Sequence, residues 1–327
     1  MAGREILTRL PAVVGPTASG KTSLAIAVGR RLGCEIISCD SMQIYREMDI
    51  GTAKPTAAER AALPHHLLDF LPPGTPYSAA DYAADAYRTV EEILSRGRLP
   101  LFCGGTGLYL EAAARGGEEQ ETIPGATAIR ASLQKEANEQ GADALWQRLQ
   151  EVDPAAAAAT HKNNTRRVIR ALEVYLATGV PKTEWDARTR RRPPVLSVVP
   201  LMLTYPDRTL LYRRIDERVA LMLQSGLVEE ARGLYERGLL SPGTTAAQAI
   251  GYKELLPHLA GTCARQTAVE ALCLATRHYA KRQLTWFAHM PGLLSLSAVD
   301  ETGAPRTVDD LADEAVRLFA AAGVAAP

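Results

Sequence analysis

The amino-acid sequence predicts an α/β fold, a doubly wound and mainly parallel sheet that carries an inserted all-helical domain. Residues 15–22 fit the phosphate-loop pattern G-x-x-x-x-G-K-S/T, with an apolar run before them and a helical repeat after them. Short apolar runs alternate with helical stretches through residues 1–117 and again through 196–327, whereas residues 118–195 have the pattern of polar helices. We therefore expect a core in two parts, interrupted by a helical domain.

The length and composition fit this architecture. At 327 residues the chain suits one α/β core with an insertion, or two domains, and its 46% apolar and 23% charged residues are ordinary for a soluble globular protein. No apolar run approaches the ~18 residues of a membrane span, and no signal-peptide pattern opens the sequence. The five cysteines include no C-x-x-C pair, which indicates reduced thiols and no zinc site. We expect a cytoplasmic monomer with no membrane partner.

The phosphate loop follows a buried strand expected at 10–14 and precedes a helix expected at 22–32. Its glycines let successive N–H groups form a concave nest around phosphate oxygens, and the following helix points its positive end at the same anion. Lys21 adds a full charge, and the Thr22 hydroxyl is the usual Mg²⁺ ligand at such loops. A nucleotide or another diphosphate fits these features, and a glycine-rich turn that binds nothing is the alternative. The predicted diphosphate-binding residues are Gly15, Pro16, Thr17, Ala18, Ser19, Gly20, Lys21 and Thr22.

A second strand is expected at 35–39, and Asp40 follows it directly. Residues just past the carboxyl end of a strand face the ligand crevice of a doubly wound sheet, so Asp40 should lie near the phosphate loop. The pair His65-His66 lies further along the chain. Adjacent side chains point to opposite sides of a strand and no further ligand is spaced nearby, so we expect no metal there.

A helix with a capping-box start is expected at 78–96 and a third strand at 99–103, which brings residues 104–107 to the crevice. No Asp ends this strand, so the Walker B magnesium ligand of an ATPase is missing. That absence argues against nucleotide hydrolysis.

Helices of the insertion are expected at 127–140, around Trp146, from Asp153 onward, and at 165–177. Residues 161–192 hold nine Lys and Arg against three acids, an excess of six positive charges in a chain of net charge zero. Such segregation is typical of a surface that meets a polyanion, and a solvated basic face is the alternative.

The second part of the core begins with a strand expected at 195–203 and interrupted by Pro200. Asp207 then caps a helix that Gly226 closes. The remaining expected elements are helices at 227–237 and 267–287, and a last helix with Val308, Leu311, Ala315 and Leu318 as its apolar stripe.

Several blocks of the sequence resemble the bacterial tRNA dimethylallyltransferases. They are GPTASGKT (15–22), ISCDSMQIY (37–45), MDIGTAKP (48–55), PHH (64–66), GGTGLY (104–109), RRVIRALE (166–173), QAIGYKE (248–254) and KRQLTWF (281–287).

The resemblance extends from about residue 11 to residue 290, with the blocks in the family's order. Two positions depart from the family pattern. No acid follows Pro124, and Ala220 stands where an Asp is common. These departures concern acceptor docking or helix packing and leave the chemistry intact.

The resemblance implies transfer of a dimethylallyl group from dimethylallyl diphosphate to the exocyclic amine of adenosine 37, beside the anticodon of tRNAs that read codons beginning with U. It also implies Mg²⁺ as cofactor, at Thr22. The nest, Lys21 and the metal then stabilise charge on the departing diphosphate. An aromatic amine is a poor nucleophile, so we expect Asp40 to take its proton, with a role as Mg²⁺ ligand as the alternative. Thr17 and Thr106 are expected to bind diphosphate or adenine, or else to cap loops. The predicted catalytic residues are Asp40, Lys21, Thr22 and Thr106.

The adenine must be flipped out of a stacked anticodon loop, which costs unstacking free energy. Phosphate contacts and stacking in the protein offset this free energy. We expect the insertion to close over the anticodon stem-loop. The predicted tRNA-binding residues are Asp40, Ser41, Met42, Gln43, Thr106, Arg166, Arg167, Arg170, Gln248, Gly251, Tyr252, Lys253, Lys281, Arg282 and Gln283; Trp286 is either a base contact or a core residue.

Three other functions compete with this interpretation. They are a phosphate-loop kinase, an isopentenyltransferase acting on free adenine nucleotides, and an RNA-binding module without activity. The missing Walker B Asp weakens the first, and the basic insertion favours a macromolecular acceptor over the second. Intact Lys21, Thr22 and Asp40 argue against the third.

Overall fold

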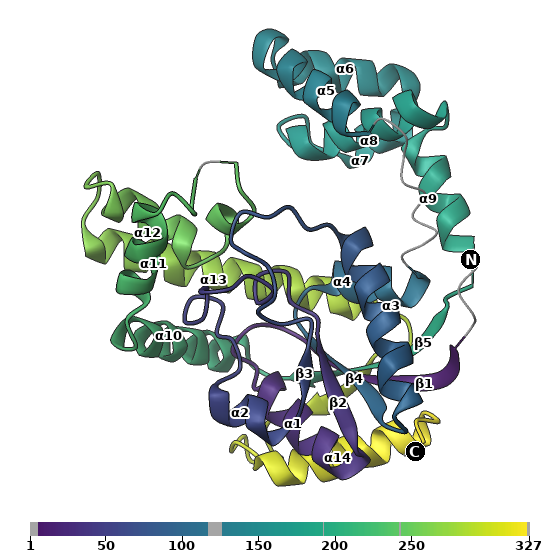
Figure 1. The fold of residues 1–327 in the computed structure, drawn as a ribbon, viewed down its shortest axis with the longest axis vertical. Coiled ribbons are helices and arrows are strands. Elements are labelled where there is room, and N and C mark those ends of the chain that lie inside the picture. The colour runs from purple at the N-terminus through teal and green to yellow at the C-terminus, as the bar shows by residue number, and fades with distance from the viewer. Residues whose placement is uncertain (1–5, 117–125, 192, 242, 326–327) are drawn as a thin grey trace. The chain divides into compact units, whose positions relative to one another are not determined.

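The computed structural model describes residues 6–116, 126–191, 193–241 and 243–325. The chain divides into two compact units, which Figure 1 draws and which we describe separately. Unit 1 comprises Met1–Glu118 and Val195–Pro327, and unit 2 comprises Glu119–Pro194.

Unit 1 is built on a sheet of six strands in the order β3-β2-β4-β1-β5-β6. Every ladder between neighbouring strands is parallel. This arrangement confirms the predicted α/β class with a parallel sheet. The strands are β1 (Ile6–Val14), β2 (Cys34–Ser38), β3 (His65–His66), β4 (Leu99–Gly104), β5 (Leu196–Thr204) and β6 (Leu294–Ser297).

Helices cover both faces of this sheet, because the strand order requires connections in both directions from β1 and such crossovers share one hand. Helix α1 packs against α14 on one face, and α3 packs against α4 on the other (Figure 1). The helices of unit 1 are α1 (Lys21–Leu32), α2 (Ala57–Ala62), α3 (Ala79–Ser95), α4 (Gly107–Arg115), α10 (Arg208–Gln224), α11 (Leu227–Glu236), α12 (Tyr252–Leu259), α13 (Arg265–Ala288) and α14 (Val308–Ala321), with a short 3₁₀ turn η2 (Ala246–Gln248).

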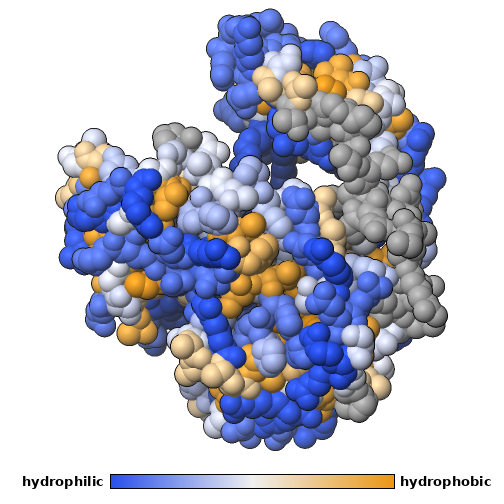
Figure 2. All heavy atoms as spheres, in the orientation of Figure 1, coloured by the Kyte–Doolittle hydropathy of each residue, from blue (hydrophilic) through white to orange (hydrophobic). Residues whose placement is uncertain are grey.

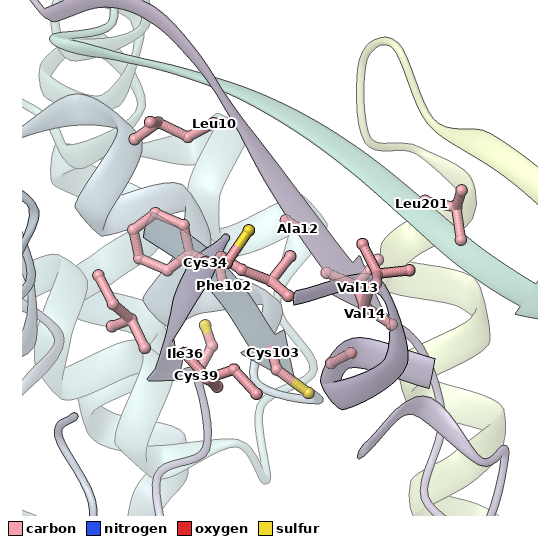
Figure 3. Packing of buried hydrophobic residues seen from close by; sticks show 14 of the residues in the cluster. Leu10, Ala12, Val13, Val14, Cys34, Ile36, Cys39, Phe102, Cys103 and Leu201 are labelled. Atoms are coloured by element: carbon pink, nitrogen blue, oxygen red, sulfur yellow. The ribbon is translucent and has the colours of Figure 1, made fainter. Parts of the chain in front are cut away.

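The main core lies between the sheet and these helices. Apolar side chains of β1, β2 and β4 fill it, among them Leu10, Val13 and Phe102 (Figure 3). Cys34, Cys39 and Cys103 are free thiols in or beside this core. Burial raises the pKa of the Cys103 thiol to about 11, so this thiol is unreactive at neutral pH.

One sequence-based expectation about the sheet is wrong. Strand β5 runs without interruption through Pro200. Its neighbour β6 pairs only with residues from Leu201 onward, so the missing N–H of Pro200 leaves no bond to β6 unmade. The predicted helix end at Gly226 is confirmed: Ser225 caps α10, and Gly226 follows it with φ +98° before α11 begins at Leu227.

A second apolar cluster in unit 1 was not foreseen. Ile44, Tyr45 and Met48 pack there with side chains of α11 and α12, including Leu227 and Leu255. This cluster fixes the chain that follows Asp40, so it supports one side of the site described below.

Unit 2 contains α5 (Ala126–Gln140), α6 (Ala142–Val152), α7 (Pro154–Ala159), α8 (Thr165–Thr178) and α9 (Lys182–Arg191). Leu133, Leu149 and Leu172 belong to its core. The buried Glu173 carboxylate binds the guanidinium groups of Arg130 and Arg170. The family departure after Pro124 lies outside the described residues.

Hydrophilic side chains dominate the outer surface of both units in the view of Figure 2. None of the helices in the part of the chain that the structure describes is both long and apolar enough to span a bilayer.

Candidate active site

The phosphate loop joins β1 to α1 and has the backbone that its glycines permit. Gly15 has φ +133°, and Gly20, which precedes the first turn of α1, has φ +92°. Ala18 also takes a left-handed conformation, with φ +62°. A residue other than glycine held in that region stores strain, which is commonest at functional loops.

Side chains from α10 and α13 and the chain before α10 hold this loop in place. Arg214 Nε donates to the Ala18 carbonyl at 2.9 Å, and the Tyr205 hydroxyl donates to the Ser19 carbonyl at 2.8 Å. Gln283 accepts from the Thr17 N–H at 2.9 Å, and its Nε2 donates to the Gly105 carbonyl, also at 2.9 Å. Gln283 therefore ties the phosphate loop to the glycine-rich loop after β4.

Two cavities meet at the phosphate loop. The first has a volume of about 260 Å³, and Lys21, Thr22, Asp40 and Arg218 are among its lining residues. The second, of about 530 Å³, is also lined by Lys21, Thr22 and Arg218. Ala53 borders both cavities. The structure thus brings together the predicted phosphate-binding and catalytic residues Lys21, Thr22 and Asp40.

The charges of this site favour an anion. Burial lowers the pKa of Lys21, and the positive charge of Arg218 lowers it further. Burial also lowers the pKa of the Arg218 guanidinium. The cations of Lys21 and Arg218 thus lie close together where burial partly excludes water, and the Asp40 carboxylate lines the same cavity. A ligand with several negative charges would compensate them.

Asp40 is held in a fixed direction by the turn that follows it. Its Oδ1 accepts the Met42 N–H at 2.9 Å. Thr106 Oγ1 accepts the Ser41 N–H at 3.1 Å, and Thr106 N donates to the Cys39 carbonyl at 3.0 Å. Thr106 therefore caps the loop that carries Asp40, which matches the capping role considered for it.

Gln43 lines the first cavity, and its amide is engaged inside the protein. Nε2 donates to the carbonyls of Thr52 and Ala53 at 3.1 and 3.2 Å, and Oε1 accepts from Ser38 Oγ at 3.4 Å. Gln43 thus supports the cavity wall formed by residues 51–53.

Two predicted tRNA contacts need correction. Tyr252 is fully buried, and its hydroxyl donates to Glu230 at 2.6 Å, so its ring offers no surface to a base. Gln283 lines the first cavity, but it is only 4% exposed and its amide is the loop clamp described above. The polar groups of both side chains are hydrogen-bonded inside the protein.

The other predicted tRNA-binding residues fall into three groups. Ser41, Met42, Gln248 and Arg282 line the first cavity. The exposed residues are Lys253 and Lys281 on unit 1 and Arg166, Arg167 and Arg170 on unit 2. Gly251 is buried at the start of α12. Trp286 is 43% exposed and so is not a core residue.

Sequence reasoning missed Arg214 and Arg218. They lie four apart on α10, a spacing that puts both on one helix face, and this repeat was a usable signal. The departure at Ala220 is exposed on the same helix.

The residues at the loop suit a Mg²⁺ ion, which usually keeps several waters and takes one or two carboxylates together with substrate phosphates. Thr22 and Asp40 line one cavity and supply a hydroxyl and a carboxylate. Across the described residues, no three His, Cys, Asp or Glu side chains gather closely enough to form a protein-only metal site. His66 instead binds the Glu35 carboxylate at 2.7 Å.

The fold and the site define a class of protein: a phosphate-loop enzyme with a carboxylate in the cavity beside the loop. A family model described as IPP transferase matches residues 43–290, and one described as Isopentenyl transferase matches residues 8–69. The chain belongs to this family, whose curated members carry the name tRNA dimethylallyltransferase.

Relatives and solved structures agree with this assignment. The tRNA dimethylallyltransferase of Geobacillus kaustophilus is 48% identical over 279 residues, which cover 85% of this chain and 87% of that protein. The Geobacter sulfurreducens protein of the same name is 44% identical, over 95% of this chain and 97% of its own length. The structure of the tRNA isopentenylpyrophosphate transferase of Bacillus halodurans matches with a TM-score of 0.68 and 39% identity, covering 96% of each chain. A eukaryotic dimethylallyltransferase acting on tRNA matches with a TM-score of 0.78 and 27% identity, covering 96% of this chain and 78% of its own.

Proposed function

We propose that this protein transfers a dimethylallyl group from dimethylallyl diphosphate to the exocyclic amine of adenosine 37 in tRNAs that read codons beginning with U, and releases diphosphate. One observation carries the proposal. Lys21, Thr22, Arg218 and Asp40 line a single cavity, so cations for a leaving diphosphate and an acceptor for a proton lie together. A cytoplasmic monomer remains the expected form.

In this reaction the bond between the allylic carbon and the diphosphate oxygen breaks, and a bond from the amine nitrogen to that carbon forms. Negative charge develops on the departing diphosphate. Lys21, Arg218 and the N–H groups of the phosphate loop stabilise that charge from fixed positions, so no reorganisation is needed during the step. Ser19 Oγ is buried in this loop and has no partner among the described residues, which suits a further phosphate contact.

The amine loses a proton as its nitrogen forms the new bond. Asp40 accepts that proton, because its carboxylate shares the cavity with the phosphate-binding groups and its direction is fixed through Met42. Acid–base assistance of this kind contributes about 10²–10⁴-fold to the rate.

Thr22, with Asp40 as an alternative or additional ligand, would hold Mg²⁺. When bound, the metal adds positive charge beside the leaving diphosphate. The two roles of Asp40 differ in their effect on metal affinity. Asp40→Asn leaves the Mg²⁺ requirement unchanged if Asp40 is the base alone, and raises the Mg²⁺ concentration needed if it is also a ligand.

The tRNA partner is supported by exposed cations on both units. Arg282 lines the first cavity, while Arg166 and Arg167 lie exposed on α8. We propose that these groups contact the phosphates of the anticodon stem-loop while adenosine 37 is flipped into the first cavity. The predicted closure of the insertion over the RNA belongs to the same proposal.

The test uses purified full-length protein with labelled dimethylallyl diphosphate and Mg²⁺. Parallel reactions contain unmodified tRNA, the same tRNA with guanosine at position 37, or AMP, and a further set contains ATP with each acceptor. We expect label only in the tRNA that has adenosine 37. Label in AMP supports the isopentenyltransferase of free nucleotides, phosphoryl transfer from ATP supports a kinase, and either result overturns the proposal.

A further inference from the structure

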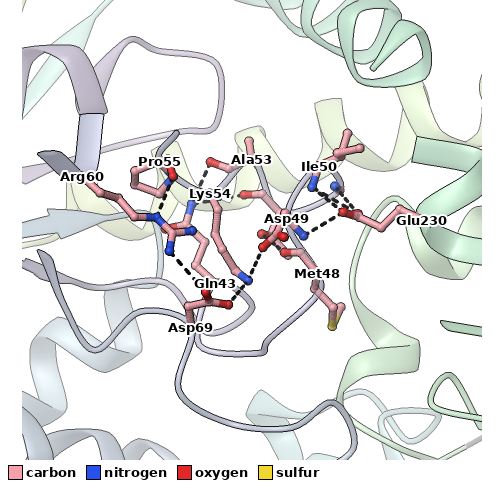
Figure 4. A network of polar contacts seen from close by, with 12 residues as sticks. Gln43, Met48, Asp49, Ile50, Ala53, Lys54, Pro55, Arg60, Asp69 and Glu230 are labelled. Atoms are coloured by element: carbon pink, nitrogen blue, oxygen red, sulfur yellow. Dashed lines mark hydrogen bonds and ion pairs between the residues drawn. The ribbon is translucent and has the colours of Figure 1, made fainter. Parts of the chain in front are cut away.

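One wall of the first cavity is a stretch of backbone that a carboxylate holds at its start. Gly51, Thr52 and Ala53 line this wall. Just before them, Glu230 of α11 accepts three successive N–H groups: those of Asp49 at 3.0 Å, Ile50 at 2.9 Å and Gly51 at 3.0 Å (Figure 4).

The same carboxylate has a fourth donor. The Tyr252 hydroxyl binds Glu230 Oε1 at 2.6 Å. The Tyr252 ring also lies directly against Gly51, since a Cβ added at Gly51 would lie 2.5 Å from a ring carbon. Residues of α11 and α12 therefore hold the loop at residues 49–51 through hydrogen bonds and packing. Hydrogen bonds to an ionised carboxylate are stronger than those between neutral groups.

The far end of the loop has a second anchor. The buried Lys54 ammonium binds Asp49 Oδ1 at 2.5 Å and Asp69 Oδ1 at 2.6 Å. Arg60 Nε donates to the Pro55 carbonyl at 2.9 Å (Figure 4). The contacts of Lys54 with Asp69 and of Arg60 with Pro55 involve no residue held by Glu230. Lys54 and Pro55 line the second cavity together with Ala53.

The anchored loop is connected to the carboxylate that takes the proton. Gln43 donates to the Thr52 and Ala53 carbonyls. Its own N–H and that of Met42 point at Asp40 Oδ1, at 3.4 and 2.9 Å. A shift of the wall therefore moves Gln43 and with it the turn that orients Asp40.

We propose that Glu230 is a positioning residue of the acceptor site: it fixes the wall at residues 51–53 and, through Gln43, the direction of the Asp40 carboxylate. This inference rests on the proposed function, because it assigns the first cavity to the acceptor base. Glu230 itself is not among the residues that line the first or the second cavity.

Glu230→Gln is the sharpest variant, because it keeps the shape and replaces one oxygen by an amide nitrogen that faces an N–H donor. Loss of charge-assisted bonds of this kind predicts a fall of about ten- to hundredfold in kcat/KM for tRNA, with kcat lowered as well. The KM for dimethylallyl diphosphate should stay within about threefold of wild type, since the second anchor keeps Ala53 in place.

Two variants serve as matched controls. Glu229→Gln removes the same charge from the exposed neighbour on α11, and Tyr252→Phe removes one of the four donors while keeping the ring. Glu229→Gln should retain kcat/KM within about threefold. Tyr252→Phe should give a smaller loss than Glu230→Gln, because the three N–H donors keep their carboxylate. If Glu230→Gln does not fold, Gly51→Ala displaces the same wall by contact with Tyr252 and should give the same selective loss for tRNA.

Hydrogen exchange of the substrate-free protein tests the anchor without reference to activity. In Glu230→Gln the amides of residues 49–51 should lose protection, while those of β1 and β4 keep it. Unchanged protection, or lost protection with unchanged kcat/KM for tRNA, overturns the proposal. If the wild type modifies no tRNA, the proposed function fails, and the role of Glu230 in the acceptor site fails with it. The exchange measurement then still shows whether Glu230 holds residues 49–51.

Discussion

Replacing Gln283 by Leu separates a structural role from a tRNA contact. The side chain is 4% exposed and makes two hydrogen bonds of 2.9 Å, one from the Thr17 N–H and one to the Gly105 carbonyl. Leu is of similar size and makes neither bond. Because two backbone groups lose their partner beside a buried side chain, we expect the free energy of unfolding to fall by about 2–4 kcal/mol.

The same substitution releases the phosphate loop at Thr17. We therefore expect a raised KM for dimethylallyl diphosphate, since the loop that binds its diphosphate is no longer held against the Gly105 loop. The free energy of unfolding is measured in urea on the full-length protein, with tryptophan fluorescence or amide hydrogen exchange in unit 1 as the signal. KM values come from initial rates at varied concentrations of each substrate.

Arg282→Ala is the matched control, because it changes the neighbouring residue on α13, which is exposed and lines the first cavity. It should weaken tRNA binding and leave unfolding within about 0.5 kcal/mol of wild type. The reasoning is refuted if Gln283→Leu is as stable as wild type and loses affinity for tRNA alone, since Gln283 would then face the RNA.

Three further predictions concern the charged groups. Asp40→Asn should lower the single-turnover rate by about 10²–10⁴-fold while the affinity for dimethylallyl diphosphate, measured by equilibrium binding, changes little. Burial and then the Arg218 charge lower the pKa of Lys21, so kcat/KM for dimethylallyl diphosphate should fall as pH rises through that lowered value, where Lys21 loses its proton. In Arg218→Gln this fall should move to higher pH, and an unmoved pH profile would contradict the coupling. Arg166→Glu with Arg167→Glu should weaken tRNA binding and reduce its salt dependence, with binding of dimethylallyl diphosphate unchanged as the control.

The parts of the site that sequence predicted are those fixed by local pattern. The phosphate loop needs its glycines at set positions, and Asp40 directly follows a strand that ends beside the loop, so both could be placed without knowing any distant contact. The parallel sheet followed from the alternation of strands and helices in the same way.

The parts that sequence missed depend on contacts between distant residues. Tyr252 and Gln283 belong to blocks typical of the family, and their polar groups suggested outward contacts. Their partners Glu230, Thr17 and Gly105 lie 22, 266 and 178 positions away along the chain. No periodicity within one segment reveals such pairings, which depend on the packing of α11, α12 and α13 in three dimensions.

The two cavities that meet at Lys21 and Thr22 have a consequence for the order of events. Under the proposed function, diphosphate forms where the two cavities share Lys21 and Thr22, and the second cavity is lined by Glu59 and Leu221 but not by Asp40. We therefore expect the small anion to leave through the second cavity while the RNA base still occupies the first. Turnover on successive RNA molecules then need not be limited by escape of the anion.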